Sequence, residues 1–463
     1  MAERTSRRPE LLVRLARGSS EPLRQQIERA FREAIRSQRL GPGCAVPSTR
    51  TLASDLGLSR GVVVQAYDQL IAEGYLLSTP GAPTRVSGAV RAPAPEPPEP
   101  EPRSAEIDFR PGEPDLRAFP LEAWRRSLRA VLSDLDHRWL GYNDPRGLAG
   151  LRTALATYLA RARGVAVSAQ NIVICNGCAQ GLSMAGHVLR RQGVRRVAIE
   201  APGHPDIRHI LAEAGLECVP VPVDDEGLRV SDLEPQRVRA VVLSPAHQNP
   251  VGGVLAPHRR QQLLAWASQS AGVIVEDDYD AEYRYDRVGV GALQGLAPER
   301  VLYVGSTSKI LAPALRLGWL VAGRPFLEDA IETKRRLDNG SPAIDQLTLA
   351  HFLDAGELDR HIRRMRVPYQ CRRDALLAAI ARHCPRWRVR GAAAGLHLLA
   401  ESPASVDIDR LVQRAAEASV RLYPLSRYTV GASRRAGLVF GYARLTEREI
   451  AEGMRRVGRA LRS

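Results

Sequence analysis

The sequence predicts two domains of different fold class: a small, mainly α-helical N-terminal domain and a larger α/β domain with a mostly parallel central sheet. The stretch APAPEPPEPEPR (92–103) has six prolines and four charged residues among its twelve, which is typical of an extended linker without a core. Helical patterns precede it, whereas strand-like apolar runs alternating with helices follow it. We therefore expect a domain at 1–87, a linker at 88–106 and a domain at 107–463.

The composition is that of a folded globular protein. Of the 463 residues, 44% are hydrophobic and 25% are charged. No apolar run approaches the ~18 residues of a membrane span, and the N-terminus lacks the apolar core of a secretory signal. We expect a cytoplasmic protein that does not bind a membrane.

The net charge of +15 is compatible with a polyanionic partner such as DNA. Of the 66 basic residues, however, 64 are arginine, which also fits a general arginine bias of the genome. The basic surplus is spread over both domains. Charge alone is therefore weak evidence for nucleic-acid binding.

The six cysteines are expected to be reduced, because the chain is large and has no secretory signal. Cys175 and Cys178 form a CxxC pair, but no second ligand pair at zinc-site spacing accompanies it. Neither a metal site nor a redox role is therefore favoured for this pair.

Residues 1–87 read as three helices followed by a hairpin. The first helix carries its apolar residues on one face, and Ser48 and Ser59 are expected to cap the next two, which end near Gly57 and Gly74. Two short helices joined by a glycine turn suggest a helix-turn-helix. The stretch YLLSTPGAPTRVS (75–87) has strand residues around a Pro-Gly turn and predicts a β-wing.

This segment resembles the GntR-type winged helix-turn-helix. The shared residues are Pro22, Leu23, Gln26, Ile27, Leu40, Pro42, Gly43, Pro47, Ser48, Arg50, Leu52, Ala53, Leu56, Gly57, Ser59, Arg60, Ala66, Tyr67, Leu70 and Gly74. In such domains the third helix enters the major groove. The resemblance implies operator DNA as a partner, contacted by Ser48, Arg50, Ser59, Arg60 and, from the wing, Arg85, with Gly61 and Gln65 near base edges.

Two departures and one alternative bear on these contacts. Val62 stands where the family often has Thr, and the wing reads STPGAPT where the family often has RxGxGT. The alternative is that Arg50 and Arg60 are solvated helix residues without a DNA contact.

The larger domain shows six strand-like runs with helical stretches between several of them. The runs are NIVIC, RRVAIE, RAVVLSP, GVIVEDD, RVLYVGS and LRLGWLVA. Near-continuous apolar strands are typical of a parallel sheet covered on both faces, and ligands bind such sheets at the strand ends.

Chemistry-bearing residues follow several of these runs. Lys309 is one of only two lysines and lies among hydroxyl residues in GSTSKILAPALRLGW. A lysine amine can form a Schiff base, although a surface lysine is the alternative. Ser306, Ser308 and Arg316 are suited to a phosphate.

Three further segments are weaker signals on their own. NGCAQGL (176–182) opens a helix, whose N-terminal amides bind phosphate. Asp277 and Tyr279 in VIVEDDYDAEYRY are placed to bond a pyridine nitrogen and a phenolic oxygen, and Asn249 in HQNPVGG can donate to a ring oxygen. The alternatives are a helix cap, a salt bridge and a turn.

Together, in this order, the segments resemble the fold type I aminotransferases, which use pyridoxal 5'-phosphate. The resemblance implies a smaller C-terminal α+β subdomain, an internal aldimine at Lys309, Asp277 on the pyridine nitrogen, which makes the ring an electron sink, and a homodimer. The implied cofactor residues are Gly177, Cys178, Ala179, His204, Asn249, Asp277, Tyr279, Ser306, Ser308, Lys309, Arg316 and, from the neighbouring subunit, Tyr142.

The whole chain resembles the MocR/GabR family of bacterial transcription regulators. The resemblance implies that pyridoxal phosphate, or an amine reacting with it, alters DNA binding. His204 replaces the common Tyr, and Val439 and Asp206 stand where a γ-aminobutyrate sensor has arginines, so that effector is not expected. Arg427, Arg434 and Arg435 lie nearby, although surface arginine is the favoured interpretation of each.

Two other functions stay open. The protein could be a working aminotransferase with an accessory DNA-binding domain. It could also be a regulator whose large domain is a scaffold without cofactor, which the presence of Lys309, Asp277 and Arg316 argues against.

Overall fold

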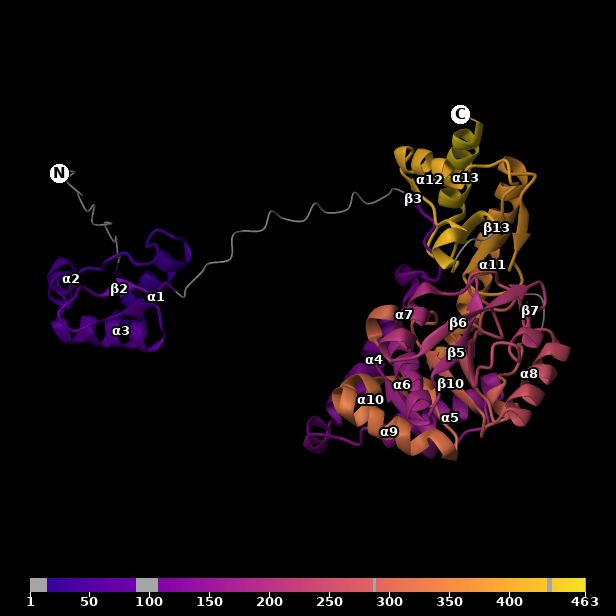
Figure 1. Cartoon of the computed structure of the whole chain (residues 1–463), viewed down its shortest axis with the longest axis horizontal. Coiled ribbons are helices and arrows are strands. Elements are labelled where there is room, and N and C mark those ends of the chain that lie inside the picture. The colour runs from indigo at the N-terminus through magenta and orange to yellow at the C-terminus, as the bar shows by residue number, and fades with distance from the viewer. Residues whose placement is uncertain (1–14, 89–106, 286–288, 431–434, 463) are drawn as a thin grey trace. The chain divides into compact units, whose positions relative to one another are not determined.

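The computed structural model describes residues 15–88, 107–285, 289–430 and 435–462. The chain divides into two compact units, Met1–Arg103 and Ser104–Ser463 (Figure 1). Apart from Gly88, the linker expected at 88–106 lies outside the described residues. No described helix combines the length and hydrophobicity of a membrane-spanning segment.

The described part of the N-terminal unit consists of three helices and a two-stranded wing. The helices are α1 (Leu23–Arg36), α2 (Thr49–Leu56) and α3 (Arg60–Ala72), and the antiparallel strands are β1 (Leu76–Leu77) and β2 (Arg85–Val86). The rings of Phe31 and Tyr67 meet edge to face at 5.4 Å in its core. This arrangement is the one expected from the sequence.

Local residues explain where α2 and α3 begin and end. The Ser48 hydroxyl accepts a hydrogen bond from the Thr51 amide at 3.1 Å and so caps α2. Gly57 ends α2 in the left-handed conformation, with a φ of 61°. Ser59 precedes α3 but makes no capping hydrogen bond, so the capping role expected for it is wrong.

The large unit is built on a mixed, mostly parallel sheet. In the described residues it has eight strands in the order β4-β11-β10-β9-β8-β5-β6-β7. Strands β6, β5, β8, β9 and β10 run parallel, whereas β11 and the edge strand β7 pair antiparallel with their neighbours. The bounds are β4 (Ile172–Cys175), β5 (Arg196–Ala201), β6 (Glu217–Asp224), β7 (Gly227–Leu228), β8 (Ala240–Leu243), β9 (Val273–Asp278), β10 (Val301–Ser306) and β11 (Gly318–Val321).

Helices cover both faces of this sheet (Figure 1). Alternate residues of β4 decide the side: Ile172 and Ile174 pack with α5 and α10, whereas Val173 and Cys175 pack with α6 and α9. The helices are α4 (Leu121–Ser133), α5 (Ala149–Arg163), α6 (Cys178–Arg191), α7 (Pro205–Glu213), α8 (Pro257–Gln269), α9 (Arg324–Asp338) and α10 (Ala343–Asp354). Burial on both faces explains why the strands are apolar throughout.

Strand β6 is absent from the sequence prediction because it contains Pro220 and Pro222. It pairs along its length with β5 on one side, and meets β7 on the other side only at Val223 and Asp224. Proline lacks an N–H donor and is tolerated where the strand edge is unpaired. The two prolines therefore fit this position near the margin of the sheet.

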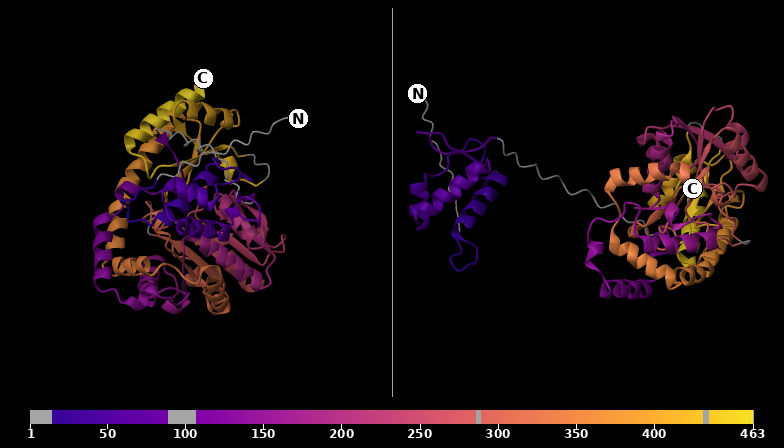
Figure 2. Two further views of the ribbon diagram at one scale, coloured as in Figure 1. Left: turned by 90° about the vertical axis from the view of Figure 1, so that its left-hand side faces the viewer. Right: turned by 90° about the horizontal axis from the view of Figure 1, so that it is seen from below.

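A smaller C-terminal lobe follows the large sheet. The long helix α11 (Glu357–His383) runs between the two lobes (Figure 2, left, orange). The lobe contains the antiparallel strands β12 (Arg388–Arg390), β13 (His397–Glu401) and β15 (Gly437–Gly441), with α12 (Ile408–Glu417) and α13 (Glu447–Arg462) beside them. Strand β3 (Ile107–Asp108) pairs in parallel with β14 (Val420–Arg421) of the same lobe.

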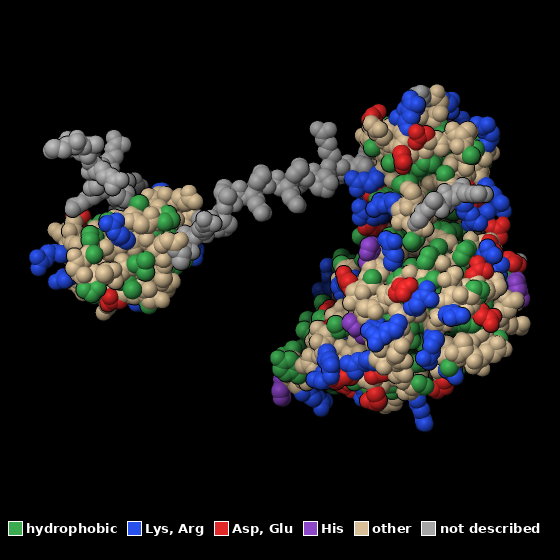
Figure 3. Space-filling view, in the orientation of Figure 1, with side chains coloured by type: hydrophobic (Ala, Val, Ile, Leu, Met, Phe, Trp, Pro, Cys, Tyr) green, Lys and Arg blue, Asp and Glu red, His purple; other side chains and the backbone are tan. Residues whose placement is uncertain are grey.

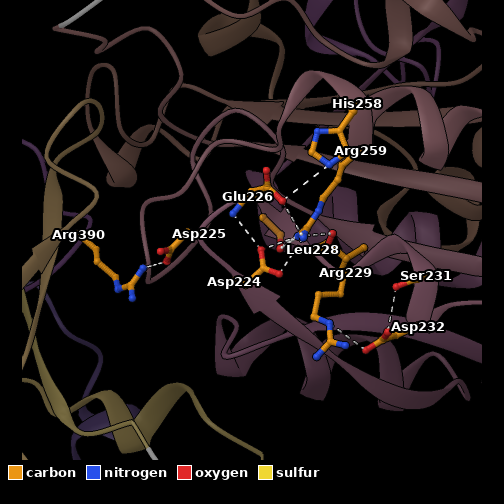
Figure 4. A network of polar contacts seen from close by, with 11 residues as sticks. Asp224, Asp225, Glu226, Leu228, Arg229, Ser231, Asp232, His258, Arg259 and Arg390 are labelled. Atoms are coloured by element: carbon orange, nitrogen blue, oxygen red, sulfur yellow. Dashed lines mark hydrogen bonds and ion pairs between the residues drawn. The ribbon is translucent and has the colours of Figure 1, made fainter.

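Polar contacts join the two lobes at the hairpin between β6 and β7. Asp225 forms an ion pair with Arg390 of β12 in the C-terminal lobe (Figure 4). It forms a second one, at 3.0 Å, with Arg388 of the same strand. The adjacent Asp224 binds Arg259 of α8 at 2.6 Å, which fixes the base of the hairpin. The hairpin thus connects the edge of the main sheet to the small lobe.

Candidate functional site

The candidate cofactor residues gather at the carboxyl ends of the parallel strands. Asp277 is the penultimate residue of β9, Ser306 ends β10 with Lys309 just beyond it, and Asn249 lies in the loop after β8. The N-terminus of α6, which follows β4, opens toward the same end of the sheet. In parallel sheets these ends are the usual ligand site, so the sequence signals meet where chemistry is expected.

The start of α6 forms an anion cradle with Arg316. Gly177 precedes the helix with a φ of 83°, and a Cβ there would lie 2.9 Å from a guanidinium nitrogen of Arg316. That guanidinium donates to the Asn176 carbonyl. Cys178 and Ala179 occupy the first turn of α6, where backbone amides have no intrahelical acceptor. The close approach of arginine to a glycine amide segment suits a phosphate.

Ser306 and Ser308 lie beside Lys309 on the neighbouring strand end. Ser306 is buried, and its hydroxyl accepts from the Ser308 amide at 3.4 Å. Their hydroxyl hydrogens remain available to an anion, as expected from the sequence.

Asp277 is a buried carboxylate facing the N-terminus of α6. One of its oxygens lies 3.1 Å from the Cys178 sulfur. Burial raises the pKa of Asp277 to about 6, although the Cys178 thiol and the charge of Lys309 oppose the rise. A protonated ring nitrogen placed here would supply the cation that this carboxylate lacks.

Lys309 is partly buried in the loop after β10. The Cβ position of Gly112 lies 3.4 Å from Lys309 Nζ, so the loop after β3 packs against the amine. Among the described residues, no hydrogen bond or ion pair engages Nζ. The amine is therefore free to react with a carbonyl group.

Tyr279 and Asn249 lie together on the other side of the site. Tyr279 is buried, and burial raises its pKa well above the ordinary value, so the hydroxyl stays protonated. Asn249 hydrogen-bonds Tyr279, whereas its own Oδ1 is buried without a partner among the described residues. Such an orphaned amide atom is explained when another polar group completes the site.

His204 lies at the start of α7, whereas Tyr142 lies on the exposed surface of the large unit. His204 precedes α7, where its Nδ1 accepts from the Asp206 amide at 3.3 Å and its ring meets Tyr428 edge to face. Tyr142 is 95% exposed, so in one chain it contacts no candidate residue. That exposure is compatible with a role in a neighbouring subunit.

Of the side chains considered for an effector carboxylate, Arg427 lines a pocket together with His204, Asn249 and Glu200. Val439 is buried in β15, and Asp206 is exposed on α7. Arg427 lies over the Tyr423 ring, and Arg435 is 3.9 Å from Glu401. Arg434 lies outside the described residues.

Sequence reasoning missed several buried polar residues at the site. His247 Nδ1 lies 3.0 Å from both carboxylate oxygens of Asp280, and the ring of His397 is 4.9 Å away from that of His247. These three side chains offer metal-ligand atoms within 4.8 Å of one another. The fourth, Glu200, accepts from the Ser244 amide, and burial raises its pKa to about 8. Both HQNPVGG and EDDYDAEYRY contain such residues, but neither segment alone shows that they meet.

The candidate DNA residues lie on the exposed surface of the N-terminal unit. Ser48 and Arg50 stand at the start of α2, and Ser59, Arg60 and Gly61 stand at the start of α3. Gln65 is exposed further along α3. Arg85 of the wing is exposed, and it donates to the Gly43 carbonyl at 2.8 Å. Both helix starts thus present exposed polar side chains.

Two family models match the two units. The model for bacterial regulatory proteins of the gntR family matches residues 23–86, and the model for aminotransferase class I and II matches residues 106–457. The pyridoxine biosynthesis transcriptional regulator PdxR of Corynebacterium glutamicum is 32% identical over 428 residues, covering 91% of both chains. The probable rhizopine catabolism regulatory protein MocR of Rhizobium meliloti is also 32% identical, covering 95% of this chain and 94% of that protein.

The chain belongs to the MocR-type family of transcription regulators. Its large unit has the fold of an aminotransferase. The kynurenine aminotransferase of Pyrococcus horikoshii, solved with PMP, matches with a TM-score of 0.71 and 26% identity over 78% of this chain and 91% of that chain. A MocR-type regulator thus combines a GntR DNA-binding domain with an aminotransferase-like domain, and the fold expected from the sequence is confirmed.

Proposed function

We propose that this MocR-type regulator binds pyridoxal 5'-phosphate at the sheet end and changes its DNA binding in response to the cofactor or to an amine that reacts with it. The observation that carries this proposal is the meeting of Lys309, Asp277 and the Gly177–Arg316 cradle at one end of the sheet. A DNA-binding domain in the same chain gives such a site a regulatory use.

The described residues fit the cofactor. The cradle of Gly177, Cys178, Ala179 and Arg316 would hold the phosphate, and buried Asp277 would hold the protonated ring nitrogen. Lys309 Nζ would hold the cofactor through its aldehyde group. When bound, the cofactor supplies an electron sink for reactions of amines.

A homodimer is part of the proposal. Tyr142 and Leu140 are 95% and 65% exposed, and Leu121 and Leu132 of α4 are exposed as well. Hydrophobic side chains gather at the lower left edge of the large unit, whereas Lys and Arg are scattered over the face shown (Figure 3). An apolar surface next to Tyr142 favours a second copy, which would receive this tyrosine at its phosphate.

A visible absorption spectrum tests the proposal. Purified protein is mixed with pyridoxal phosphate, passed through gel filtration and compared with Lys309→Ala. A yellow band that depends on Lys309 supports the proposal, and operator binding is then measured with and without cofactor and amines. A protein that never forms the band, or whose DNA binding ignores every ligand state, contradicts it.

Turnover separates a regulator from a working aminotransferase. Steady-state assays across amino donors and 2-oxo acids should show at most slow half-reactions, since buried Val439 offers no charge to a substrate carboxylate. Fast turnover without a footprint on DNA would favour the enzyme instead.

A further inference from the structure

A buried histidine–aspartate pair lies directly behind Tyr279. Side chains of His247 and Asp280 are each 1% exposed. His247 Nδ1 is 3.0 Å from both Asp280 oxygens and 3.1 Å from the Tyr279 hydroxyl. The pair therefore contacts Tyr279, and Tyr279 is the residue expected to contact the phenolic oxygen of the cofactor.

The hydrogen-bond roles in this trio follow from the carboxylate. An ionised Asp280 only accepts, so His247 Nδ1 must carry the hydrogen that faces it. The Tyr279 oxygen, at 3.1 Å, can then only share that hydrogen as a second acceptor. Its own hydroxyl hydrogen must then point away from His247.

Gly395 of the C-terminal lobe packs against the His247–Asp280 pair. Gly395 has a φ of 76°, and a Cβ there would lie 2.0 Å from His247 Cε1 and 2.6 Å from an Asp280 oxygen. The titratable groups that interact with Asp280 are Asp277, Tyr279, Tyr285 and Tyr442, and the ring of His397 from β13 lies beside that of His247. Burial lowers the pKa of His397 well below the ordinary value, so this ring is neutral and adds no charge.

A metal ion is the competing occupant of this cluster. His247, Asp280 and His397 offer ligand atoms within 4.8 Å of one another. The contacts that His247 Nδ1 makes with Asp280 and Tyr279 favour a positioning role, and zinc analysis of the purified protein separates the two.

We propose that His247 and Asp280 are positioning residues that hold the Tyr279 hydroxyl as a donor to the phenolic oxygen of pyridoxal phosphate. The donor stabilises the negative oxygen and so weakens proton binding at the Schiff-base nitrogen. This inference rests on the proposed function, because it requires the cofactor to bind.

The test is a pH titration of the cofactor absorption band. His247→Leu removes the donor while keeping side-chain volume, and His247→Asn keeps an N–H near the position of Nδ1. We expect the Leu variant to raise the pKa of the Schiff-base nitrogen by about half a unit or more, a roughly threefold change in proton affinity. The Asn variant should titrate like the wild type.

A double-mutant cycle with Tyr279→Phe identifies the route of the effect. If His247 acts through Tyr279, its replacement by Leu causes no further shift in the Phe background. An unchanged titration of His247→Leu, or an equal shift in the Phe background, overturns the inference. Stoichiometric zinc in the purified protein that is lost in His247→Asn and in His397→Ala overturns it as well.

The two proposals fail in different ways. A wild-type protein without any Lys309-dependent band refutes cofactor binding itself. A normal wild-type band with unaltered variants refutes only the role of His247 and Asp280.

If the Leu variant does not fold, Gly395→Ala provides a second perturbation, because its methyl group must displace the His247 ring. It should raise the same pKa in the wild-type background and leave it unchanged in the Phe background, and any other result contradicts the inference.

Discussion

Gly177 and Arg316 approach so closely that no side chain fits between them. A Cβ on Gly177 would stand 2.9 Å from a guanidinium nitrogen of Arg316, and the φ of 83° at Gly177 is itself unfavourable for other residues. The glycine is thus required both by backbone conformation and by the arginine that completes the cradle.

Gly177→Ala should weaken pyridoxal phosphate binding by tenfold or more, because the methyl group displaces Arg316 from the phosphate. Equilibrium binding by absorption or fluorescence measures the change. Gly150→Ala is the matched control, since a Cβ there meets nothing within 4 Å. Equal affinities of the two variants would show that the cradle does not hold the phosphate.

Arg60→Ala should weaken operator binding, by about 1–3 kcal/mol if the arginine makes one well-formed base contact. Arg60 is exposed at the start of α3, where a recognition helix meets DNA. Arg29→Ala, which removes an exposed arginine of α1 that pairs with Glu21 at 3.0 Å, is the control. Titrations at fixed salt concentration compare them, and an unaltered affinity of the Arg60 variant removes this residue from the interface.

Tyr142→Phe should reduce cofactor affinity by about tenfold if its hydroxyl reaches the phosphate of the neighbouring subunit. Mixing this variant with Lys309→Ala distinguishes the subunits. In the mixed dimer, one site combines an intact Lys309 with an intact partner tyrosine, so half of the sites should regain wild-type affinity. No recovery on mixing would mean that Tyr142 acts within its own chain or not at all.

Replacing Arg163 by Met should destabilise the large unit by about 3–5 kcal/mol. Arg163 and Asp278 form a buried pair at 2.8 Å, and Tyr303 donates to the same carboxylate at 2.6 Å. Removing the arginine leaves a buried carboxylate without its cation. Urea unfolding measures the loss, and the exposed pair of Arg125 and Glu122, broken by Arg125→Met, should matter little.

Glu200→Gln should change how stability depends on pH. Burial raises the pKa of Glu200 to about 8, so the folded protein keeps a proton that the unfolded chain loses above its ordinary value. The wild type therefore loses this stabilisation as pH rises from about 5 to about 8, whereas a neutral glutamine does not.

Relative to the wild type, the free energy of unfolding of Glu200→Gln without cofactor should increase across that range. Glu213→Gln, an exposed change on α7, should show a constant difference. A constant difference for Glu200→Gln too would mean that its carboxyl is already ionised in the folded protein.

Local signals explain what the sequence predicts correctly. Apolar runs identify β4, β5, β8, β9, β10 and β11, and Ser48 and Gly57 mark the ends of α2. The meeting of Lys309 with Asp277 and the α6 N-terminus follows from the rule for parallel sheets. Each of these inferences needs only residues close in sequence and one topological rule.

The residues that escape prediction depend on tertiary contacts. Pro220 and Pro222 argue against a strand when only the sequence is known. The pairing in the structure shows that the outer edge of β6 is largely free, which is why this strand tolerates them. His247 and Asp280 are 33 positions apart and meet beneath Gly395, which comes from the other lobe. No periodic pattern in the sequence predicts that residues so far apart lie in contact.

The pairing of β3 with β14 determines which lobe of the large unit begins the described chain after the linker. Ile107 is the first described residue after the linker, and its strand belongs to the C-terminal lobe rather than to the cofactor sheet. The tether of the DNA-binding domain is thus fastened to the lobe that also carries Gly395 and His397. Under the proposed function, a ligand that rotates this lobe would therefore move the point at which the chain leads to the GntR domain.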